Sequence, residues 1–228
     1  MIQSTVLFDT PQSEIAGRIN QLLNSSTKVC IVSGFLTEEG IKLIADPIKR
    51  NPNIIQKLVI GAGTLKAFEA LDELIGWGVQ KNRMYVNLGF SRHSTGKNPF
   101  IKYHPMLHSK VYYFEKEDGF ASAIIGSHNI TGFAFSGQNG EASILLEGKR
   151  DEKPFIDIRN HISKSIQSSK PYDPIMKEAY AWWARQYVEG LQLKIFYGGS
   201  SPDLEKIKTI LVFTVQSNLT LSDYLPLL

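Results

Sequence analysis

The chain of 228 residues has a single cysteine, Cys30, and no apolar run long enough to cross a bilayer. One cysteine cannot form a disulfide within the chain, and its place in the apolar stretch KVCIVSGF is typical of a small buried side chain. The first residues, MIQSTVLFDT, lack the basic and apolar regions of a signal peptide. We therefore expect a cytoplasmic protein without membrane attachment.

Signatures of metal and nucleotide sites are also missing. No Cys/His cluster has zinc spacing, and no carboxylate cluster suggests magnesium. The stretch GAGTLK places glycines after an expected strand, but it departs from both the P-loop and the dinucleotide-binding pattern. The sequence gives no reason to expect a metal ion or an organic cofactor.

Acidic residues are absent from one long window, residues 74–114, which carries six Lys and Arg. The rest of the chain has more acids than Lys and Arg, although the whole chain has a net charge of +3. A local positive field of this kind attracts phosphodiesters, above all nucleic acid. We expect Arg92, Lys97 and Lys102 to bind the substrate; a chance gap in the acids is the alternative.

The first half of the chain alternates between strand and helix patterns. We expect strands at 28–36, 56–63 and 83–89, and helices at 13–23, 37–50 and 64–78. Ser13 and Thr37 are suited to cap the first two helices, and Pro47 is expected to end or kink the second. This alternation is typical of βαβ units in a largely parallel sheet.

The pattern changes after residue 89, where a segment rich in Ser, Gly, Asn and Pro predicts a loop or hairpin. Three strands are expected next, at 109–114, 120–127 and 141–148, followed by helices at 152–167 and 173–190 and a strand at 191–196. We predict an α/β fold, a mixed, largely parallel sheet flanked by helices, in residues 1–150. Residues 151–228 are expected to form a helical extension, packed on the core or at a dimer interface.

Polar side chains gather around the expected strands after residue 107. His108 and Lys110 enter the first strand two positions apart, so their side chains lie on the same face. Ser127 and Asn129 follow the end of the next strand, and Glu141 opens the third. If these strands are neighbours, the five side chains converge at one edge of the sheet.

Each of these groups has a use in phosphoryl chemistry. The imidazole of His108 supplies a nucleophilic nitrogen near neutral pH. The charge of Lys110, the amide of Asn129 and the hydroxyl of Ser127 suit phosphoryl oxygens. The carboxylate of Glu141 could accept the far N–H of His108 and fix its tautomer.

The spacing of these residues resembles the signature of the phospholipase D superfamily. The matching pieces are H-x-K at 108–110, G-S-x-N at 126–129 and N-x-E at 139–141. One departure is Glu115, where the family often has Asp. The upstream stretch IVSGFLTEEGIKLI is similar to the N-terminal half of nucleases with a single motif, including metal-independent restriction endonucleases. The resemblance covers roughly residues 25–150.

The resemblance implies metal-independent phosphodiester hydrolysis through a phosphohistidine, with one histidine as nucleophile and a second as acid and base. This chain has one H-x-K motif, so we expect a homodimer with a composite site in which two copies of His108 face each other. Nucleic acid, DNA rather than RNA, is the expected substrate of an endonuclease in restriction or phage defence. A separate specificity or helicase protein is a conceivable partner, because residues 151–228 show no recognisable DNA-reading domain.

Two other classes of function stay open. One is a phospholipase or another hydrolase of small phosphodiesters. The other is a non-catalytic module that binds nucleic acid on the same fold, although the five polar residues of the site are all present.

Overall fold

The computed structural model describes residues 2–8, 15–87 and 107–178 of the chain. The expected substrate residues Arg92, Lys97 and Lys102 lie outside the described residues, as does the Ser13 cap. So do the expected strand at 191–196 and most of the expected helix at 173–190.

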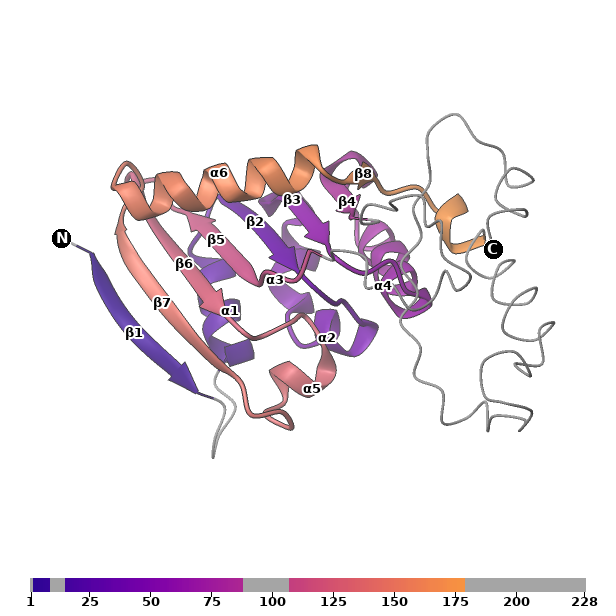
Figure 1. Ribbon diagram of the computed structural model, residues 1–228, viewed down its shortest axis with the longest axis horizontal. Helices are drawn as coiled ribbons and strands as arrows, with labels where there is room; N and C mark the ends of the chain where they lie inside the picture. The colour runs from indigo at the N-terminus through magenta and orange to yellow at the C-terminus, as the bar shows by residue number, and fades with distance from the viewer. Residues whose placement is uncertain (1, 9–14, 88–106, 179–228) are drawn as a thin grey trace, which may run out of the picture.

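The described residues form one sheet with the strand order β1-β7-β6-β5-β2-β3-β4-β8 (Figure 1). Its strands are β1 (Gln3–Phe8), β2 (Lys28–Ser33), β3 (Ile55–Ile60), β4 (Met84–Val86), β5 (Val111–Glu115), β6 (Phe120–Gly126), β7 (Ala142–Lys149) and β8 (Lys170–Pro171). The helices are α1 (Ile15–Asn24), α2 (Glu38–Lys42), α3 (Ala45–Arg50), α4 (Leu65–Gly76), α5 (Gly132–Phe135) and α6 (Lys153–Gln167). Two short 3-10 turns are η1 (Pro52–Ile54) and η2 (Lys81–Arg83).

The sheet is mixed, as the sequence predicts, but its parallel part is smaller than expected. Only β2, β3 and β4 pair in parallel among the described strands. The pairs β2–β5, β5–β6, β6–β7, β1–β7 and β4–β8 are antiparallel. One physical reason is the short turn at 116–119, which joins β5 to β6 and favours an antiparallel pair, whereas β6 and β7 are joined by the longer segment 127–141 that contains α5. Strand β1 was not anticipated, because it pairs with β7, which lies far away in the sequence.

Local capping signals explain where the helices begin and end. The Thr37 side chain accepts a hydrogen bond from Gly40 N and starts α2, as predicted. The expected single helix at 37–50 is broken into α2 and α3 before Pro47, which lies in the first turn of α3, where proline is tolerated. After α4, Gly78 takes a φ of +97°, a left-handed conformation suited to a glycine that ends a helix.

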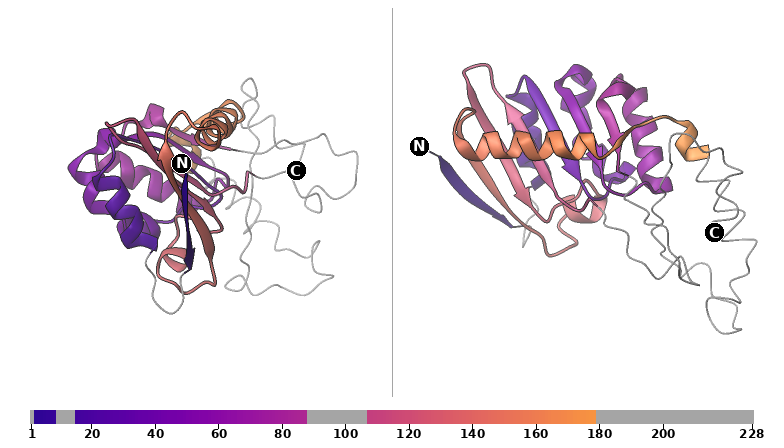
Figure 2. Two further views of the ribbon diagram at one scale, coloured as in Figure 1. Left: turned by 90° about the vertical axis from the view of Figure 1, so that its left-hand side faces the viewer. Right: turned by 45° about the horizontal axis from the view of Figure 1, so that its top comes forward.

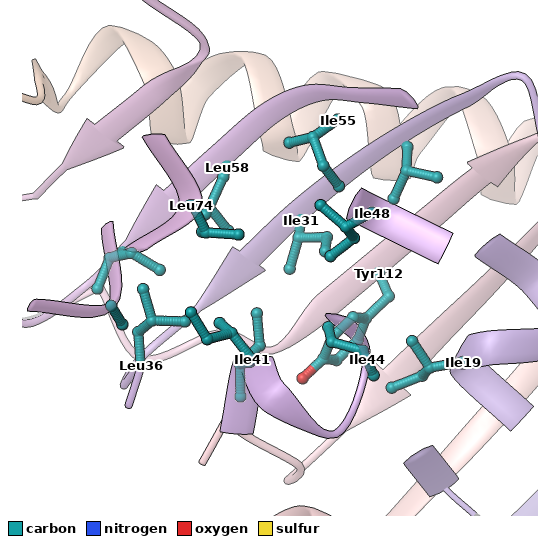
Figure 3. Packing of buried hydrophobic residues seen from close by; sticks show 14 of the residues in the cluster. Ile19, Ile31, Leu36, Ile41, Ile44, Ile48, Ile55, Leu58, Leu74 and Tyr112 are labelled. Atoms are coloured by element: carbon teal, nitrogen blue, oxygen red, sulfur yellow. The ribbon is translucent and has the colours of Figure 1, made fainter. Parts of the chain in front are cut away.

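Helices cover both faces of the sheet (Figure 2). The larger core packs α1 to α4 against one face and buries Ile19, Ile31, Ile41, Leu58 and Tyr112 (Figure 3). On the other face α6 crosses the sheet and buries Phe155, Ile158 and Ile162. Residues just after 150 are thus part of the same packed unit as the sheet. No helix within the described ranges has the length and apolarity to span a membrane.

Successive side chains of strand β5 point in turn into the two cores, because side chains alternate between the faces of a sheet. Tyr112 and Phe114 belong to the larger core, whereas Val111 and Tyr113 belong to the core under α6. Continuing the alternation toward the start of the strand places Lys110 and His108 with Tyr112, and Ser109 with Val111. Ser109 indeed faces α6, because its Oγ lies 2.9 Å from Nε2 of His161.

Candidate active site

Four strands bring their ends to one edge of the sheet. Val111 pairs with both Val32 and Ile125, and Gly126 pairs with Ser143. Since these neighbours are antiparallel, the starts of β5 and β7 meet the ends of β2 and β6. His108 and Lys110 precede β5, Ser127 and Asn129 follow β6, and Glu141 precedes β7, so all five predicted residues belong to this edge.

His108 and Lys110 are in direct contact. The ammonium Nζ of Lys110 lies 2.8 Å from Nδ1 and 2.9 Å from Nε2 of His108, and it donates a hydrogen bond of 2.6 Å to the His108 carbonyl. Because the two distances are nearly equal, the ammonium is not directed along the lone pair of one ring nitrogen alone. The imidazole of His108 and the ammonium of Lys110 can therefore contact the same atom of a bound ligand.

Burial and charge set the protonation of this pair. The pKa of His108 is lowered, first by burial and then by the positive charge of Lys110. Burial also lowers the pKa of Lys110, and the negative charge of Glu141 opposes that change. The imidazole therefore stays neutral to a lower pH than an ordinary histidine, and a neutral ring nitrogen is the form able to attack phosphorus.

Asn129 is held by a backbone donor on the neighbouring segment. The N–H of Phe35 donates a hydrogen bond of 2.9 Å to Oδ1 of Asn129. This bond sets the orientation of the amide, so that Nδ2 is directed away from Phe35. The Asn129 amide can then offer its N–H groups to an oxygen of a ligand.

Gly34 marks the point where three site residues converge. A Cβ atom at this position would lie 3.0 Å from Cδ2 of His108, 3.2 Å from Oδ1 of Asn129 and 3.4 Å from Nζ of Lys110. The backbone of Gly34 thus forms one wall of the site, and a side chain there would crowd the histidine. The convergence that the motif spacing predicts is present for His108, Lys110 and Asn129.

Ser127 bonds to the backbone of β7, and Glu141 does not make the expected contact with His108. The hydroxyl of Ser127 accepts from Ala142 N at 3.0 Å and donates to Ala142 O at 3.2 Å, so it ties the loop after β6 to β7. Glu141 accepts a hydrogen bond of 3.3 Å from Nδ2 of Asn139. In the described part of the chain it makes no hydrogen bond to His108, and its effect on the pair is the electrostatic one on Lys110.

Comparison with known families decides the membership of this chain. The family described as the NgoFVII restriction endonuclease N-terminal PLD domain, where PLD stands for phospholipase D, matches residues 13–170. The chain belongs to this family. It is therefore a member of the phospholipase D superfamily, on its restriction-endonuclease-like branch, and a hydrolase of the phosphodiesterase and nuclease class.

Solved structures confirm the phospholipase D fold. Nuc, a phospholipase D family member from Salmonella typhimurium, is 16% identical and covers 75% of this chain and 99% of its own, with a TM-score of 0.52. NucT from Helicobacter pylori is also 16% identical and covers 75% of this chain and 100% of its own, with a TM-score of 0.53. No curated protein matches the sequence.

Several residues that shape this phospholipase D site were missed by sequence reasoning. Gly34 and Phe35 contact the predicted residues, but they follow a strand that is distant in the sequence. Gly61 lies close by, and a Cβ there would collide with the carbonyl of Leu107, just before His108. The signal that could have found them is glycine directly after an apolar strand, in VSGF and VIGAG.

His128, the variable residue of G-S-x-N, has a structural place in this phospholipase D domain. It is fully buried, its Nδ1 lies 2.6 Å from Oγ of Ser143, and its carbonyl accepts a hydrogen bond of 2.8 Å from the Tyr112 hydroxyl. These bonds anchor the loop that carries Ser127 and Asn129. Within the described residues, no three His, Cys, Asp or Glu side chains gather where they could hold a metal ion.

Proposed function

We propose that this domain is a metal-independent endonuclease that cleaves nucleic acid through a phosphohistidine. The observation that carries the proposal is the convergence of His108, Lys110 and Asn129 around Gly34. This set contains a nucleophile, a fixed positive charge and amide donors. These are the groups that phosphodiester hydrolysis requires when no metal ion stabilises the charge.

The first step is an attack by a neutral ring nitrogen of His108 on the phosphorus. A nitrogen–phosphorus bond forms as the bond to the leaving oxygen breaks, and that oxygen takes the electron pair and a proton. Lys110 and the amide of Asn129 stabilise the negative charge on the remaining phosphoryl oxygens. The lowered pKa of His108 supports this role, because it favours the unprotonated ring.

The two steps together need a group that donates a proton in the first and accepts one in the second. We assign it to His108 of a second copy of the chain, in a homodimer with one composite site. That imidazolium protonates the leaving oxygen and, once neutral, removes a proton from water. The water oxygen then attacks phosphorus, the nitrogen–phosphorus bond breaks, and the first His108 is restored. One H-x-K motif per chain supports this assignment.

Nucleic acid is the substrate class that the charges favour. The acid-free window 74–114 includes the site residues His108 and Lys110, and Arg92, Lys97 and Lys102 are proposed to hold the phosphate backbone. The matching family is named for a restriction endonuclease, which supports DNA over RNA and a role in restriction or phage defence. Sequence specificity would then come from elsewhere, such as a separate specificity or helicase partner.

Incubation with single- and double-stranded DNA and RNA, each with and without EDTA, tests the proposal. We expect cleavage of DNA that EDTA leaves unchanged. Phospholipid vesicles incubated in parallel test the alternative substrate class. Loss of cleavage in EDTA that magnesium restores would refute the metal-independent mechanism, and hydrolysis of lipid without any cleavage of nucleic acid would refute the substrate.

A further inference from the structure

The aromatic ring of Phe35 lies against the imidazole of His108. The two ring centroids are 5.7 Å apart with an angle of 79° between the planes, which is an edge-to-face arrangement. Phe35 is half-buried and lies two residues beyond the end of β2. The same residue gives its N–H to Asn129, so it contacts two members of the site at once.

The backbone around Phe35 is fastened on both sides. The hydroxyl of Ser33 donates to the Phe35 carbonyl at 2.7 Å and accepts from the N–H of Ile130 at 3.1 Å. Two residues further on, the N–H of Thr37 donates to the Ile130 carbonyl at 3.0 Å. The backbone of Phe35 therefore has little freedom to move away from the site, and this holds the base of its side chain beside His108.

His108 is exposed overall, but its imidazole has close neighbours in three directions. The ring of Phe35 faces it edge to face, the backbone of Gly34 approaches its Cδ2 atom, and Lys110 lies beside its nitrogens. An imidazole held in this way has one favoured ring orientation. Attack on phosphorus depends strongly on that orientation, because the nitrogen lone pair must point at the phosphorus atom.

We infer that Phe35 is a positioning residue that holds the His108 ring in its attacking orientation and limits the access of water to it. The inference rests on the proposed function, since it concerns His108 as nucleophile. Phe35 acts through His108 and Asn129, so loss of its ring should lower kcat and leave KM nearly unchanged. A residue that contacted the substrate would instead change KM.

The protonation of His108 gives an independent readout. Partial desolvation is the main cause of its lowered pKa, although His108 is exposed overall; the charge that acts on it within the described ranges is that of Lys110, and Glu141 acts in turn on Lys110. Neither charge is altered by a change at Phe35. Opening the ring to water should therefore raise the pKa of His108, while Lys110 still keeps it below the ordinary value of about 6.5.

Two variants and one control separate the effects of the Phe35 ring. Phe35→Ala removes the cover, so NMR titration of His108 should show a higher pKa and the acid limb of the rate profile should move to higher pH. Phe35→Leu keeps an apolar cover but lacks the ring edge, so kcat should fall about three- to tenfold, the scale of one aromatic contact, with KM within about twofold. Phe120→Ala removes a ring that is 44% exposed at the far end of β6 and should change neither quantity.

Unchanged His108 titration in Phe35→Ala, or an unchanged kcat in a folded Phe35→Leu protein, would overturn the inference. A raised KM with a normal kcat would also overturn it and make Phe35 a substrate contact. The NMR titration does not need hydrolysis. A wild-type protein that cleaves no phosphodiester would refute the proposed function, whereas a raised pKa of His108 in Phe35→Ala would still support the placement of Phe35.

Discussion

The ammonium of Lys110 lies beside the imidazole of His108, within 2.9 Å of both ring nitrogens. The two residues are separated by Ser109, which points to the opposite face of the sheet and contacts His161 on α6. A spacing of two along an extended chain thus gives a nucleophile and a fixed charge on one face, and ties the residue between them to the other core.

Replacing His108 by Ala should abolish hydrolysis while the protein stays folded. The imidazole is the attacking group of the proposed mechanism, so the rate should fall by several powers of ten, far more than the loss of one positioning contact would cause. His161→Ala is a matched control, because it removes a histidine on the other side of β5 and should change the rate less than about tenfold. Near wild-type hydrolysis by a clean His108→Ala preparation would make the assignment wrong.

The rate should depend on pH through the neutral form of His108. Burial and Lys110 lower the pKa of His108, so the acid limb of kcat/KM should have its midpoint below about 6.5. Lys110→Gln removes the positive charge that disfavours the imidazolium, and NMR should then show a higher pKa of His108. Lys149→Gln, at the far end of β7, is the control and should leave the pKa of His108 unchanged. A His108 pKa that is unaltered in Lys110→Gln would contradict the electrostatic contact.

Much of the sheet and the site could be predicted because the signals were local. The alternation in β5 placed His108 and Lys110 on one face, and the EKEDG turn made β5 and β6 neighbours. These two local facts already bring Asn129 to the edge that carries His108. The helix cap at Thr37 was similarly local, since the threonine bonds an N–H three residues ahead.

Contacts between distant segments could not be predicted in the same way. Placing Phe35 against His108 requires β2 to pair antiparallel with β5, and nothing near either strand in the sequence specifies that pairing. The partner of Glu141 was also missed, because a side chain at the start of a strand can turn to a neighbour in its own loop, here Asn139. The pairing of distant strands and the rotamers of loop side chains depend on tertiary packing, which the periodic pattern of apolar residues in the sequence does not reveal.

The acid-free window should provide the electrostatic contact with nucleic acid. Changing Arg92 and Lys97 to Glu together should weaken binding to every sequence alike and reduce its salt dependence, because phosphate contacts carry no base information. Lys28→Glu with Lys149→Glu is a control of equal charge at the ends of β2 and β7 that lie away from His108. Binding curves at several salt concentrations make the measurement. Equal binding by the Arg92 and Lys97 double variant would place the substrate on another surface.

The last prediction concerns the composite site of two chains. One His108 per chain supplies a nucleophile but not the acid that protonates the leaving oxygen, so the active unit should be a homodimer with a mass near twice 25.6 kDa in sedimentation. Wild-type chains that exchange with an excess of His108→Ala chains should lose nearly all activity, because almost every wild-type chain then shares its site with a chain that lacks the second imidazole. An excess of His161→Ala chains, treated in the same way, controls for exchange itself and should leave activity in place. Activity that simply tracks the amount of wild-type chain would show that each subunit works alone, with another group as the acid.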